Sequence, residues 1–409
     1  MKIALVNNYY YLRGGSESVL FGDQEALEAA GHEVRPFAPQ DERNSATEHS
    51  AWFPRVSDYS TAGGIGLMRS ALDVVYSNSV GRAFAAFLDD FQPDVVHCHN
   101  IYGRLTTAVL DEAKQRRIPI VMTVHDLKLV CPAYLGLRKG QPCMRCQDGG
   151  YWRCLRWKCH KQSSAASLVY AVESYYNRFA GSYGSVLRFL CPSRFMQKAL
   201  IDSGIAEVRT AYHQNALPVQ NYRTRFEPGE YVLYAGRLSA EKGIWTMLAA
   251  FECANIPLRI AGTGPLEAEI RRQAVERGLH VQMEGYCTGE RLAELYRNSA
   301  FTIIPSEWYE NAPMSALESM AYGKPVLASD IGGLPELFAN GEAGHLFSSG
   351  NVDALAESAQ GLWTNPEQLR KMGLRARNIV ETRFSQSQRL TALIAVYNAV
   401  IGQKVLKEP

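Results

Sequence analysis

The chain has 409 residues, of which 46% are hydrophobic and 21% are charged, an ordinary composition for globular domains. Its length predicts two or three domains, and its formal net charge of +2 argues against a protein that binds nucleic acid through its overall charge. No apolar run reaches the roughly 18–20 residues that a membrane helix requires, so we expect a cytoplasmic protein for which a peripheral membrane contact stays open.

Strand-like and helical patterns alternate along the whole chain. The opening segment MKIALVNNYYYLR has the pattern of a first strand rather than of a signal peptide. Apolar runs predict strands at residues 2–7, 33–38, 94–99, 119–125, 185–191, 231–236, 258–262, 281–285, 301–305 and 325–329. Helical patterns are predicted at residues 16–30, 67–88, 243–253, 266–277, 291–298 and 385–401. This alternation is typical of α/β domains in which helices cover both faces of a parallel sheet.

The alternating pattern restarts after residue 217. The segment LPVQNYRTRFEPGE places two prolines and a polar run before the next strand, which predicts a linker between two Rossmann-like domains. We expect domains at 1–217 and 218–384, and a last helix in 385–409 that has no place in the second sheet. Ligands bind beyond the carboxyl ends of parallel strands, so the expected site is a cleft where the two domains face each other.

Two cations follow the first strand of the second domain. Arg237 and Lys242 lie in GRLSAEKG, around a turn that leads into a helix. Arg can bind a diphosphate with two hydrogen bonds, and Lys acts as a point charge. The pair therefore predicts a diphosphate site, and two solvated surface charges are the alternative.

Glycines mark further strand ends. Gly14 and Gly15 follow the first strand, with Ser16 as the expected N-cap, and Gly332 and Gly333 precede a later helix. Glycine lets the backbone approach a ligand closely, and a helix N-terminus favours anions. Both pairs are therefore candidate phosphate-binding loops, whereas the glycines of AGTGP predict only a tight turn.

Two glutamates flank the start of a predicted helix. In SEWYENAPMSALESMAYGKPVLAS, Glu310 precedes a helix that begins near Ala312 with Pro313 in its first turn, and Glu318 falls within the apolar stripe of that helix. Along a helix axis the two carboxylates are about 12 Å apart, which matches a nucleotide sugar from hexose to ribose. Glu318 would then face the ribose and Glu310 the sugar; the alternative is that Glu318 pairs with a neighbouring Lys or Arg.

Taken together, these motifs resemble the family 4 glycosyltransferases of the GT-B fold. The resemblance runs almost continuously through the second half, in GRLSAEKG, IAGTGPL, LAELYRNSAFTIIPS, the Glu-x7-Glu pair and AYGKPVLASDIGGLPEL. The first half is similar to the family in RGGSE, DVVHCHN, TVHD and CPSRFMQKALIDSGI. The resemblance implies two Rossmann-like domains facing across a cleft and a final helix that crosses back to the first domain.

The resemblance also implies a reaction. It is retaining transfer of a sugar from a nucleotide diphosphate sugar, with no metal or other cofactor in catalysis. The first domain would bind the acceptor, a saccharide or a polyprenyl-linked saccharide, and residues 218–384 would bind the donor. The implied setting is surface polysaccharide or glycolipid assembly at the inner face of the cytoplasmic membrane, with no nucleic-acid partner. No residue stands out as a covalent nucleophile, so we expect the acceptor to attack on the face that the leaving group vacates.

By matched position, the resemblance assigns roles to individual residues. Arg237 and Lys242 match the pyrophosphate clamp, and Glu318 matches the ribose ligand. The catalytic groups beside the donor sugar are expected to be Glu310 and His125. The remaining substrate-binding residues are expected to be Gly14, Gly15, Asn311, Ala312, Pro313 and Met314. Many relatives carry a small residue where this chain has Asn311, so the sequence does not predict which sugar is transferred.

Two other functions remain open. A catalytically silent sugar-nucleotide-binding protein would keep Arg237, Lys242 and Glu318, but it would not need Glu310 and His125. An NAD-dependent enzyme would require G-x-G-x-x-G after the first strand and an acidic residue about twenty positions later. The segment NNYYYLRGGSES lacks that pattern.

Five of the nine cysteines lie in an insert that follows TVHD and is foreign to the family's minimal pattern. The spacing of Cys143, Cys146, Cys154 and Cys159 predicts a structural zinc site rather than disulfides in a reducing compartment. Alternative ligands are Cys131 and His160, and unligated thiols or an iron–sulfur cluster are other interpretations. The cysteines outside the insert are expected to be buried small side chains: Cys98, Cys191, Cys253 and Cys287.

The same insert is basic. Residues 131–161 contain seven Lys or Arg and one acidic residue, Asp148. Tyr151, Trp152 and Trp157 are interleaved with them, and this combination suits an anionic membrane surface or a pyrophosphate-linked lipid acceptor. A solvated basic knob is the alternative.

Two histidines in VHCHN, His97 and His99, share one face of a predicted strand because side chains alternate along a strand. A metal pair is one interpretation. Histidines that line the site or pack at the strand end are the other.

Overall fold

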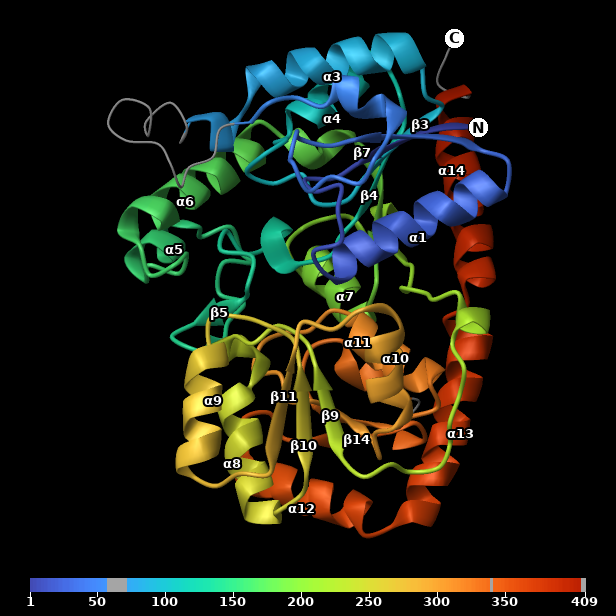
Figure 1. Ribbon diagram of the computed structural model, residues 1–409. Coiled ribbons are helices and arrows are strands. Elements are labelled where there is room, and N and C mark those ends of the chain that lie inside the picture. Colours follow the sequence, from blue (N-terminus) through green and yellow to red (C-terminus); the bar gives the residue numbers. More distant parts are fainter. Residues whose placement is uncertain (57–71, 339–340, 406–409) are drawn as a thin grey trace. The chain divides into compact units, whose positions relative to one another are not determined.

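The computed structural model describes residues 1–56, 72–338 and 341–405. The chain divides into two compact units. The first unit comprises Met1–Lys139, Cys143–Gln214 and Arg389–Pro409, and the second comprises Gly140–Pro142 and Asn215–Gln388. Each unit is built on a six-stranded sheet with helices packed on it (Figure 1), which confirms the α/β fold class with two Rossmann-like domains.

The first unit contains a parallel sheet with strand order β2-β1-β3-β4-β7-β8. Its strands are β1 (Lys2–Val6), β2 (Glu33–Phe37), β3 (Val95–Cys98), β4 (Ile120–Thr123), β7 (Val186–Cys191) and β8 (Thr210–Tyr212). The strand order reverses between β1 and β3. In open parallel sheets such a switch point is where ligands bind, so the loops after these two strands are the first place to look for a site.

The helices of the first unit are α1 (Gly15–Ala29), α3 (Asn78–Phe91), α4 (Ala108–Gln115), α5 (Trp152–Arg156), α6 (Ser164–Phe179) and α7 (Arg194–Asp202). The short strands β5 (Leu137–Arg138) and β6 (Gln141–Pro142) belong to the Cys-rich insert. The helix predicted at 67–88 falls partly outside the described residues. In its described part the helix is interrupted, because the Ser77 side chain accepts from the Val80 amide and caps α3 there.

The final helix, α14 (Gln386–Val405), packs on the sheet of the first unit. Its buried side chains belong to the same apolar cluster as one face of that sheet: Leu393, Tyr397 and Val400 with Ile3, Leu5, Val95, Val121 and Leu190. Near its start, Arg389 forms a buried ion pair with Asp23 of α1. Figure 1 shows α1 and α14 together in this unit. The prediction that the last helix crosses back to the first domain is confirmed.

The second unit contains a parallel sheet with strand order β11-β10-β9-β12-β13-β14. Its strands are β9 (Val232–Ala235), β10 (Leu258–Ala261), β11 (Val281–Gly285), β12 (Thr302–Ile304), β13 (Val326–Ser329) and β14 (Gly344–Phe347). This is the strand order of dinucleotide-binding Rossmann domains, and its switch point lies between β9 and β12. The loops that carry Lys242 and Glu310 follow those two strands.

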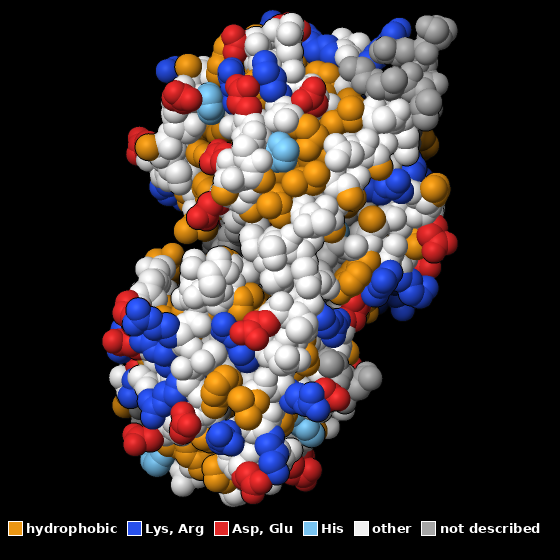
Figure 2. All heavy atoms as spheres, turned by 90° about the vertical axis from the view of Figure 1, so that its right-hand side faces the viewer, with side chains coloured by type: hydrophobic (Ala, Val, Ile, Leu, Met, Phe, Trp, Pro, Cys, Tyr) orange, Lys and Arg blue, Asp and Glu red, His pale blue; other side chains and the backbone are white. Residues whose placement is uncertain are grey.

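The helices of the second unit are α8 (Ile244–Ala254), α9 (Glu267–Glu276), α10 (Gly289–Arg297), α11 (Met314–Ala321), α12 (Val352–Trp363) and α13 (Pro366–Arg383). Short 3-10 turns lie at Glu48–Trp52, Leu127–Leu129, Ser182–Ser185, Glu207–Arg209, Val219–Asn221, Ala240–Lys242 and Leu334–Leu337. Among the described residues, no helix combines the length and the hydropathy needed to cross a bilayer. On the face shown in Figure 2, Lys and Arg are interspersed with Asp and Glu.

Candidate functional site

The switch point of the second unit is organised around Glu310, which is buried. Its Oε1 atom accepts three hydrogen bonds: from Lys242 Nζ at 2.6 Å, from Ser306 Oγ at 2.6 Å and from Trp308 Nε1 at 2.8 Å. The Lys242 ammonium also lies 4.6 Å from the centre of the Trp308 ring. Loops from β9 and β12 therefore meet at one carboxylate oxygen.

The charge of Glu310 is set by two opposing effects. Burial by itself raises the pKa of this carboxyl group, but the Lys242 charge and the hydrogen bonds from Lys242, Ser306 and Trp308 bring the pKa below its usual value. Glu310 is therefore ionised at neutral pH and is held beside a cation. Such an arrangement fixes both charges in place before any ligand arrives.

Two glycines let the loops approach this closely. Gly243 has φ +69°, and a Cβ there would lie 1.8 Å from the Pro305 carbonyl oxygen, so only glycine lets the turn before α8 contact the loop after β12. Gly332 has φ +62°, and a Cβ there would lie 2.3 Å from the Glu310 carbonyl oxygen. The Gly333 amide donates to that same oxygen at 2.7 Å. The SDIGG loop thus fixes the Glu310 backbone, and the phosphate-loop role predicted for its glycines stays a prediction.

Arg237 differs from Lys242 in its surroundings. Its side chain is exposed, and it forms no ion pair with another residue that the structure describes. Its loop is fixed instead through Leu238, whose amide donates to the Thr263 carbonyl at 3.0 Å, while a Cβ on Gly264 would lie 2.3 Å from the Leu238 carbonyl oxygen. The AGTGP segment is therefore a turn that packs on the backbone of the Arg237 loop.

Glu318 lies on α11 and faces a tyrosine rather than a cation. Tyr296 Oη donates to Glu318 Oε2 at 3.0 Å, and the Tyr296 ring stacks on Tyr322 with centroids 5.3 Å apart. Burial raises the pKa of the Glu318 carboxyl, although the Tyr296 hydrogen bond opposes this. No Lys or Arg of the described chain forms an ion pair with it, so the alternative of a Lys or Arg partner is not found.

The helix that carries Glu318 starts later than predicted. It begins at Met314, with Pro313 as the cap in an extended conformation, rather than near Ala312. Ala312 and Met314 are buried, and the Ala312 carbonyl accepts from Asn215 Nδ2 at 2.9 Å. Asn311 is only partly buried. These residues therefore join Glu310 to α11 by a firmly held loop.

In the first unit, His125 follows β4 and is hydrogen-bonded to a second histidine. His99 Nδ1 and His125 Nε2 are 2.8 Å apart, and the two rings are nearly parallel. Burial and the positive charge of Arg389 lower the pKa of His125 to about 3. His125 is therefore neutral at physiological pH and has one ring nitrogen committed to His99.

His97 is a packed histidine. Its ring is fully buried, with Nδ1 2.7 Å from the Tyr397 hydroxyl and Nε2 2.8 Å from Thr123 Oγ1. His97 and His99 lie 4.4 Å apart between ring centres. Within the described part of the chain, no three His, Cys, Asp or Glu side chains are placed to hold a metal ion. The structure thus shows the packed histidines that the sequence left as an alternative.

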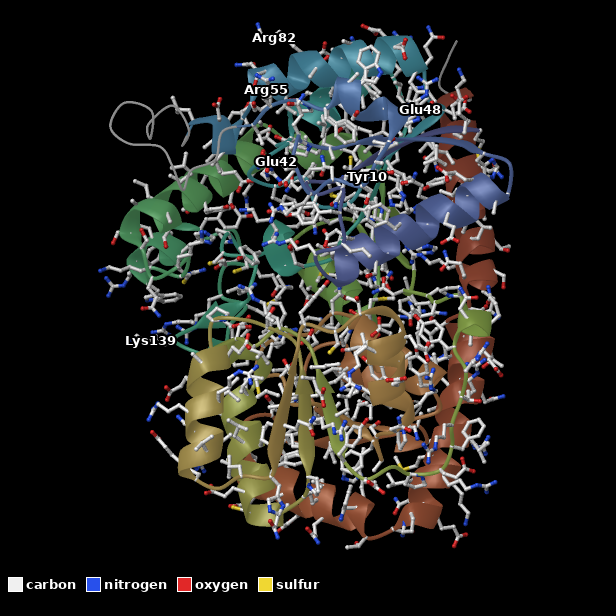
Figure 3. All side chains as sticks on the ribbon, viewed as in Figure 1. Tyr10, Glu42, Glu48, Arg55, Arg82 and Lys139 are labelled. Carbon is white, nitrogen blue, oxygen red and sulfur yellow. The ribbon has the colours of Figure 1, made fainter. Side chains whose placement is uncertain are left out.

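The glycine pair after β1 starts α1 one residue earlier than predicted. Gly14, not Ser16, is the N-cap; Gly14 and Gly15 are exposed, and a Cβ on Gly14 would make ordinary contact with Glu17 Oε2 at 3.9 Å. The segment before it is anchored by Tyr10, labelled in Figure 3, which packs on Phe21 with centroids 5.1 Å apart and donates to Gln24 Oε1 at 3.1 Å. Gly14 and Gly15 are therefore accessible at the switch point of the first unit.

Glu17 is a buried acidic residue beside the glycine pair that the sequence interpretation did not single out. It lies in the first turn of α1 and is buried, and its Oε1 atom accepts from Ser16 Oγ at 2.9 Å and from Asn7 Nδ2 at 3.3 Å. Burial raises the pKa of this carboxyl group. The available signal was an acidic residue two positions after a glycine pair at a strand end.

The cysteines of the insert lie close to one another but show no metal geometry. Cys131, Cys146 and Cys154 are buried, Cys143 and Cys159 are partly exposed, and all are free thiols. A hydrogen bond from the Cys154 thiol lowers the pKa of Cys159 to about 7. None of these thiols belongs to a group of three placed to hold a metal ion in the described residues, so the zinc site stays a prediction.

The burial predicted for the other cysteines is only partly right, and the role of His160 as an alternative zinc ligand stays a prediction. The His160 ring packs on Tyr170, with centroids 4.2 Å apart, and burial lowers the pKa of His160 to about 4. Cys98 and Cys191 are buried as expected, but Cys253 is exposed and Cys287 is partly exposed. Cys253 lies on the outer side of α8, where its apolar sequence neighbours do not determine its burial.

Some of the basic charge of the insert is used internally. The Arg138 guanidinium stacks 4.2 Å from the Trp157 ring centre, and Arg153 forms a 2.6 Å ion pair with Asp148. Lys139 lies at the turn between β5 and β6 and is labelled in Figure 3. Trp157 and Arg153 are therefore less available to an external surface than the sequence suggests.

Comparison with known proteins gives two family matches. The family model "Glycosyltransferase Family 4" matches residues 13–219, and the family model "Glycosyl transferases group 1" matches residues 221–379. Together the two matches span both units, and the first alone covers half of the chain.

Curated relatives are similar over shorter stretches. The chain is 28% identical over 177 residues to O-antigen chain mannosyltransferase C of Escherichia coli, covering 42% of this chain and 48% of that protein. It is 31% identical over 171 residues to the D-rhamnosyltransferase WbpZ of Pseudomonas aeruginosa, covering 41% and 44%. The chain thus spans about half the length of these two relatives. It is 27% identical over 337 residues to the putative glycosyltransferase EpsD of Bacillus subtilis, covering 78% and 80%.

Solved structures share the fold across nearly the whole chain. A sucrose-phosphate synthase from Thermosynechococcus elongatus superimposes with a TM-score of 0.71 at 22% identity, covering 98% of this chain and 99% of that one. Anabaena HepE in complex with UDP superimposes with a TM-score of 0.67 at 16% identity, covering 98% and 100%.

Proposed function

The chain belongs to glycosyltransferase family 4, and from this premise we propose that it transfers a sugar from a nucleotide diphosphate sugar to a saccharide or lipid-linked acceptor. The observation that carries the proposal is the meeting of Lys242, Ser306 and Trp308 at Glu310 Oε1, at the switch point of the second unit. Relatives named for O-antigen mannose and D-rhamnose transfer support a setting in surface polysaccharide or glycolipid assembly.

The cations of this site suit a departing diphosphate. Arg237 is exposed and has no ion pair among the described residues, so its guanidinium can grip two phosphate oxygens. Lys242 gives one hydrogen bond to Glu310 and, as an ammonium, has two further donors. Positive charge fixed at the strand ends can stabilise the leaving group in the way that a metal ion does in other enzymes. We therefore propose transfer that needs no catalytic metal.

The retaining course is also a proposal. Glu310 is held by three donors on one oxygen, and its depressed pKa shows that its negative charge is already stabilised. A carboxylate of this kind is a weak nucleophile and a good orienting group for the hydroxyls of the donor sugar. We therefore favour attack by the acceptor on the face that the diphosphate vacates. A glycosyl–enzyme adduct trapped at Glu310 and identified by peptide mass spectrometry would refute this course.

His125 is proposed to lie beside the donor sugar and the attacking hydroxyl. It is neutral at physiological pH, and its Nε2 atom is engaged by His99. The His99–His125 hydrogen bond fixes the orientation of the ring. Gly14 and Gly15, accessible at the switch point of the first unit, are proposed to shape the acceptor side.

Glu318 is proposed to bind the ribose of the donor. Its Oε2 atom accepts from Tyr296, and burial disfavours its charge. Two ribose hydroxyls can satisfy a partly buried carboxylate without a cation, which makes a sugar a better partner than a phosphate. The absence of an ion pair at Glu318 among the described residues fits this role.

The experiment that tests the proposal is calorimetric titration of UDP, GDP, ADP and dTDP in the presence of EDTA. Wild-type protein is expected to bind one of these nucleotides, and Glu318→Ala is expected to weaken that binding roughly tenfold or more. Glu276→Ala, an exposed carboxylate on α9, serves as the control and should bind as wild type does. If none of the four nucleotides binds, the proposed binding site for the nucleotide sugar donor is refuted.

A second readout separates an enzyme from a silent binding protein. Hydrolysis of the matching nucleotide sugar, measured as released nucleoside diphosphate, is expected for wild type and lost in Glu310→Gln with nucleotide binding retained. Nucleotide binding without any turnover on a panel of saccharide acceptors would favour the silent binding protein.

The structural zinc is proposed on the spacing of Cys143, Cys146, Cys154 and Cys159 and on their free thiols. Elemental analysis of protein purified without chelator is expected to give one zinc per chain, lost when Cys154 is replaced by Ser. The zinc site would be refuted if the purified protein contained no zinc and all of its thiols reacted with a thiol reagent after unfolding. The cysteines of the insert would then be packed side chains without a metal.

A further inference from the structure

Helix α6 has the reverse of the usual amphipathic arrangement. Its buried side chains are mostly polar: Ser167, Ala171, Glu173, Ser174 and Asn177. Its exposed large side chains are apolar: Leu168, Val172, Tyr176 and Phe179, with exposed fractions between 38% and 83%. Spacings of four, four and three residues place the second set on one helix face. A surface helix normally turns such a stripe toward the core, so this stripe faces outward for a reason.

The polar side of α6 is held inward by specific bonds. Glu173 Oε2 lies 2.5 Å from Lys128 Nζ, and both side chains are nearly buried. Asn177 Nδ2 donates to Glu173 Oε1 at 2.8 Å, and Thr107 Oγ1 donates to Asn177 Oδ1 at 2.8 Å. Turning the helix to bury its apolar stripe would leave the Lys128 charge buried without a partner, which is strongly unfavourable. The outward stripe is therefore a fixed feature of the fold.

Helix α5 extends the apolar surface. Figure 1 shows it beside α6, and the two are joined by the Tyr151–Tyr175 ring contact at 5.1 Å and by the Trp152 amide, which donates to the Tyr175 hydroxyl at 3.2 Å. Trp152 and Leu155 of α5 are exposed. Six of the twelve large hydrophobic side chains that the described residues expose thus lie on these two short helices. We refer to Trp152, Leu155, Leu168, Val172, Tyr176 and Phe179 as the α5–α6 surface.

The charged residues of this region that lack an ion pair are basic. Arg156, Lys158 and Lys161 are exposed and form no ion pair with any described residue. The acidic residues between positions 145 and 180 are Asp148 and Glu173, and these pair with Arg153 and Lys128. The α5–α6 surface therefore combines unpaired positive charge with Trp, Tyr, Phe and Leu, as in proteins that lie on anionic bilayers.

We propose that the α5–α6 surface docks on an anionic phospholipid bilayer, with its apolar side chains at the boundary between headgroups and acyl chains and its basic residues against the headgroups. The inference rests on the proposed function, because docking on a bilayer would give a glycosyltransferase access to a lipid-linked acceptor. It extends the contact from the insert, whose Trp157 is covered by Arg138 and whose α5 contributes Trp152 and Leu155, to the outer face of α6. A two-fold contact between copies would place this positive region against itself and is disfavoured.

Flotation of the full-length protein with vesicles tests the proposal. Wild type is expected to float with vesicles of equal parts phosphatidylcholine and phosphatidylglycerol and to float poorly with pure phosphatidylcholine. Val172→Glu/Phe179→Glu is expected to reduce the bound fraction roughly tenfold or more. Its matched control is Val208→Glu/Val275→Glu, which adds the same charges at exposed valines away from α6; Val275 is 82% exposed and Phe179 is 83% exposed. The control is expected to float as wild type does.

Each outcome decides the question. Equal flotation of the α6 variant and wild type overturns the proposal, and so does a wild type that fails to float. A concentration-dependent dimer that the α6 variant makes monomeric, without flotation, would assign the surface to a second copy. Replacing Arg156, Lys158 and Lys161 together by Gln should remove the preference for anionic vesicles. Nucleotide titration of the same proteins separates the two proposals, because the α6 variant should bind nucleotide normally whether or not it binds vesicles.

Discussion

Arg389 and Asp23 form a two-point ion pair in the first unit. Arg389 Nε and Nη2 each lie 2.6 Å from an Asp23 carboxylate oxygen, and both side chains are 1% exposed. Arg389 Nη1 also donates to the Gln214 carbonyl at 2.6 Å. The pair joins α1 near the start of the chain to α14 near its end, so the first unit is complete only when the chain has returned from the second.

Breaking this pair on one side should be strongly destabilising. Asp23→Asn leaves the Arg389 guanidinium buried beside a neutral group, and we expect a loss of about 3–5 kcal/mol in the free energy of unfolding of the first unit. Hydrogen exchange of β1 and β3 amides measures this unit separately from the second. Glu269→Gln, which breaks an exposed pair with Arg272, is the control and should cost less than about 1 kcal/mol. Equal losses in the free energy of unfolding for the two variants would show that the buried pair stabilises the first unit no more than an exposed pair does.

The Lys242–Glu310 pair predicts an effect on both stability and activity. Lys242→Met leaves Glu310 buried without its cation, so the pKa of Glu310 should rise above its usual value and the second unit should lose about 1–3 kcal/mol of stability. Lys242→Met/Glu310→Gln should recover most of that stability, because no buried charge then lacks a partner. Chemical denaturation with hydrogen exchange of β9 and β12 amides measures the stability.

The activity of these two variants should not follow their stability. Both Lys242→Met and the double variant should lose roughly a hundredfold or more in kcat/KM for the nucleotide sugar, because the leaving group loses a fixed cation. A double variant that regains activity along with stability would make Lys242 a structural residue rather than a ligand of the diphosphate.

Gly332 and Gly278 provide a matched test of close backbone approach. Both have φ +62°, but a Cβ on Gly332 would lie 2.3 Å from the Glu310 carbonyl oxygen, whereas one on Gly278 would meet nothing within 4 Å. Gly278→Ala should cost about 1–2 kcal/mol for the left-handed backbone alone. Gly332→Ala should cost at least about 3 kcal/mol, because the β12 loop must also shift. Thermal unfolding of both variants measures these losses of stability. Equal losses would show that the SDIGG loop can move away from the Glu310 carbonyl at little cost in free energy.

Sequence patterns predicted the parallel sheets well because buried parallel strands are short apolar runs bounded by polar turns. All ten predicted strands are present within one or two residues of their predicted limits. The sheet-edge strands β8 and β14 were missed. Thr210 and Tyr212 of β8, and Gly344 and His345 of β14, do not form apolar runs. The other two edge strands, β2 and β11, were predicted from their sequence pattern, so it is the lack of an apolar run that hid β8 and β14.

The candidate site was predicted in its residue types but not in its contacts. Glu310 and Lys242 were recognised as separate motif residues, and they meet where Gly243 packs closely on Pro305. The hydrogen bond from Asn7 to Glu17 and the one between His99 and His125 each join side chains from different elements of the fold, and a single sequence does not show that these side chains meet. The inverted polarity of α6 was equally hidden, because its cause, the Lys128–Glu173 pair, lies outside the helix pattern.

The buried histidines predict acid sensitivity of the first unit. Burial, together with the charge of Arg389, lowers the pKa of His125 to about 3, and the pKa values of His97, His99 and His213 are also depressed, mainly by burial. The unfolded chain binds protons at these groups near pH 6.5, before the folded chain does. Their contribution to stability is therefore present above pH 6.5 and is lost as the pH falls toward the folded values.

At pH 5, His125 alone should account for a loss of about 2 kcal/mol relative to pH 7. Asp126 acts in the opposite sense, because burial raises its folded pKa to about 6 and its contribution is lost as the pH rises through that value. Asp126→Asn should therefore steepen the acid-induced loss, whereas His125→Asn should reduce it. Hydrogen exchange of β3 and β4 amides at pH 7 and pH 5, corrected for intrinsic exchange rates, measures both effects. An unchanged pH dependence in both variants would mean that neither group titrates differently in the folded and unfolded chain.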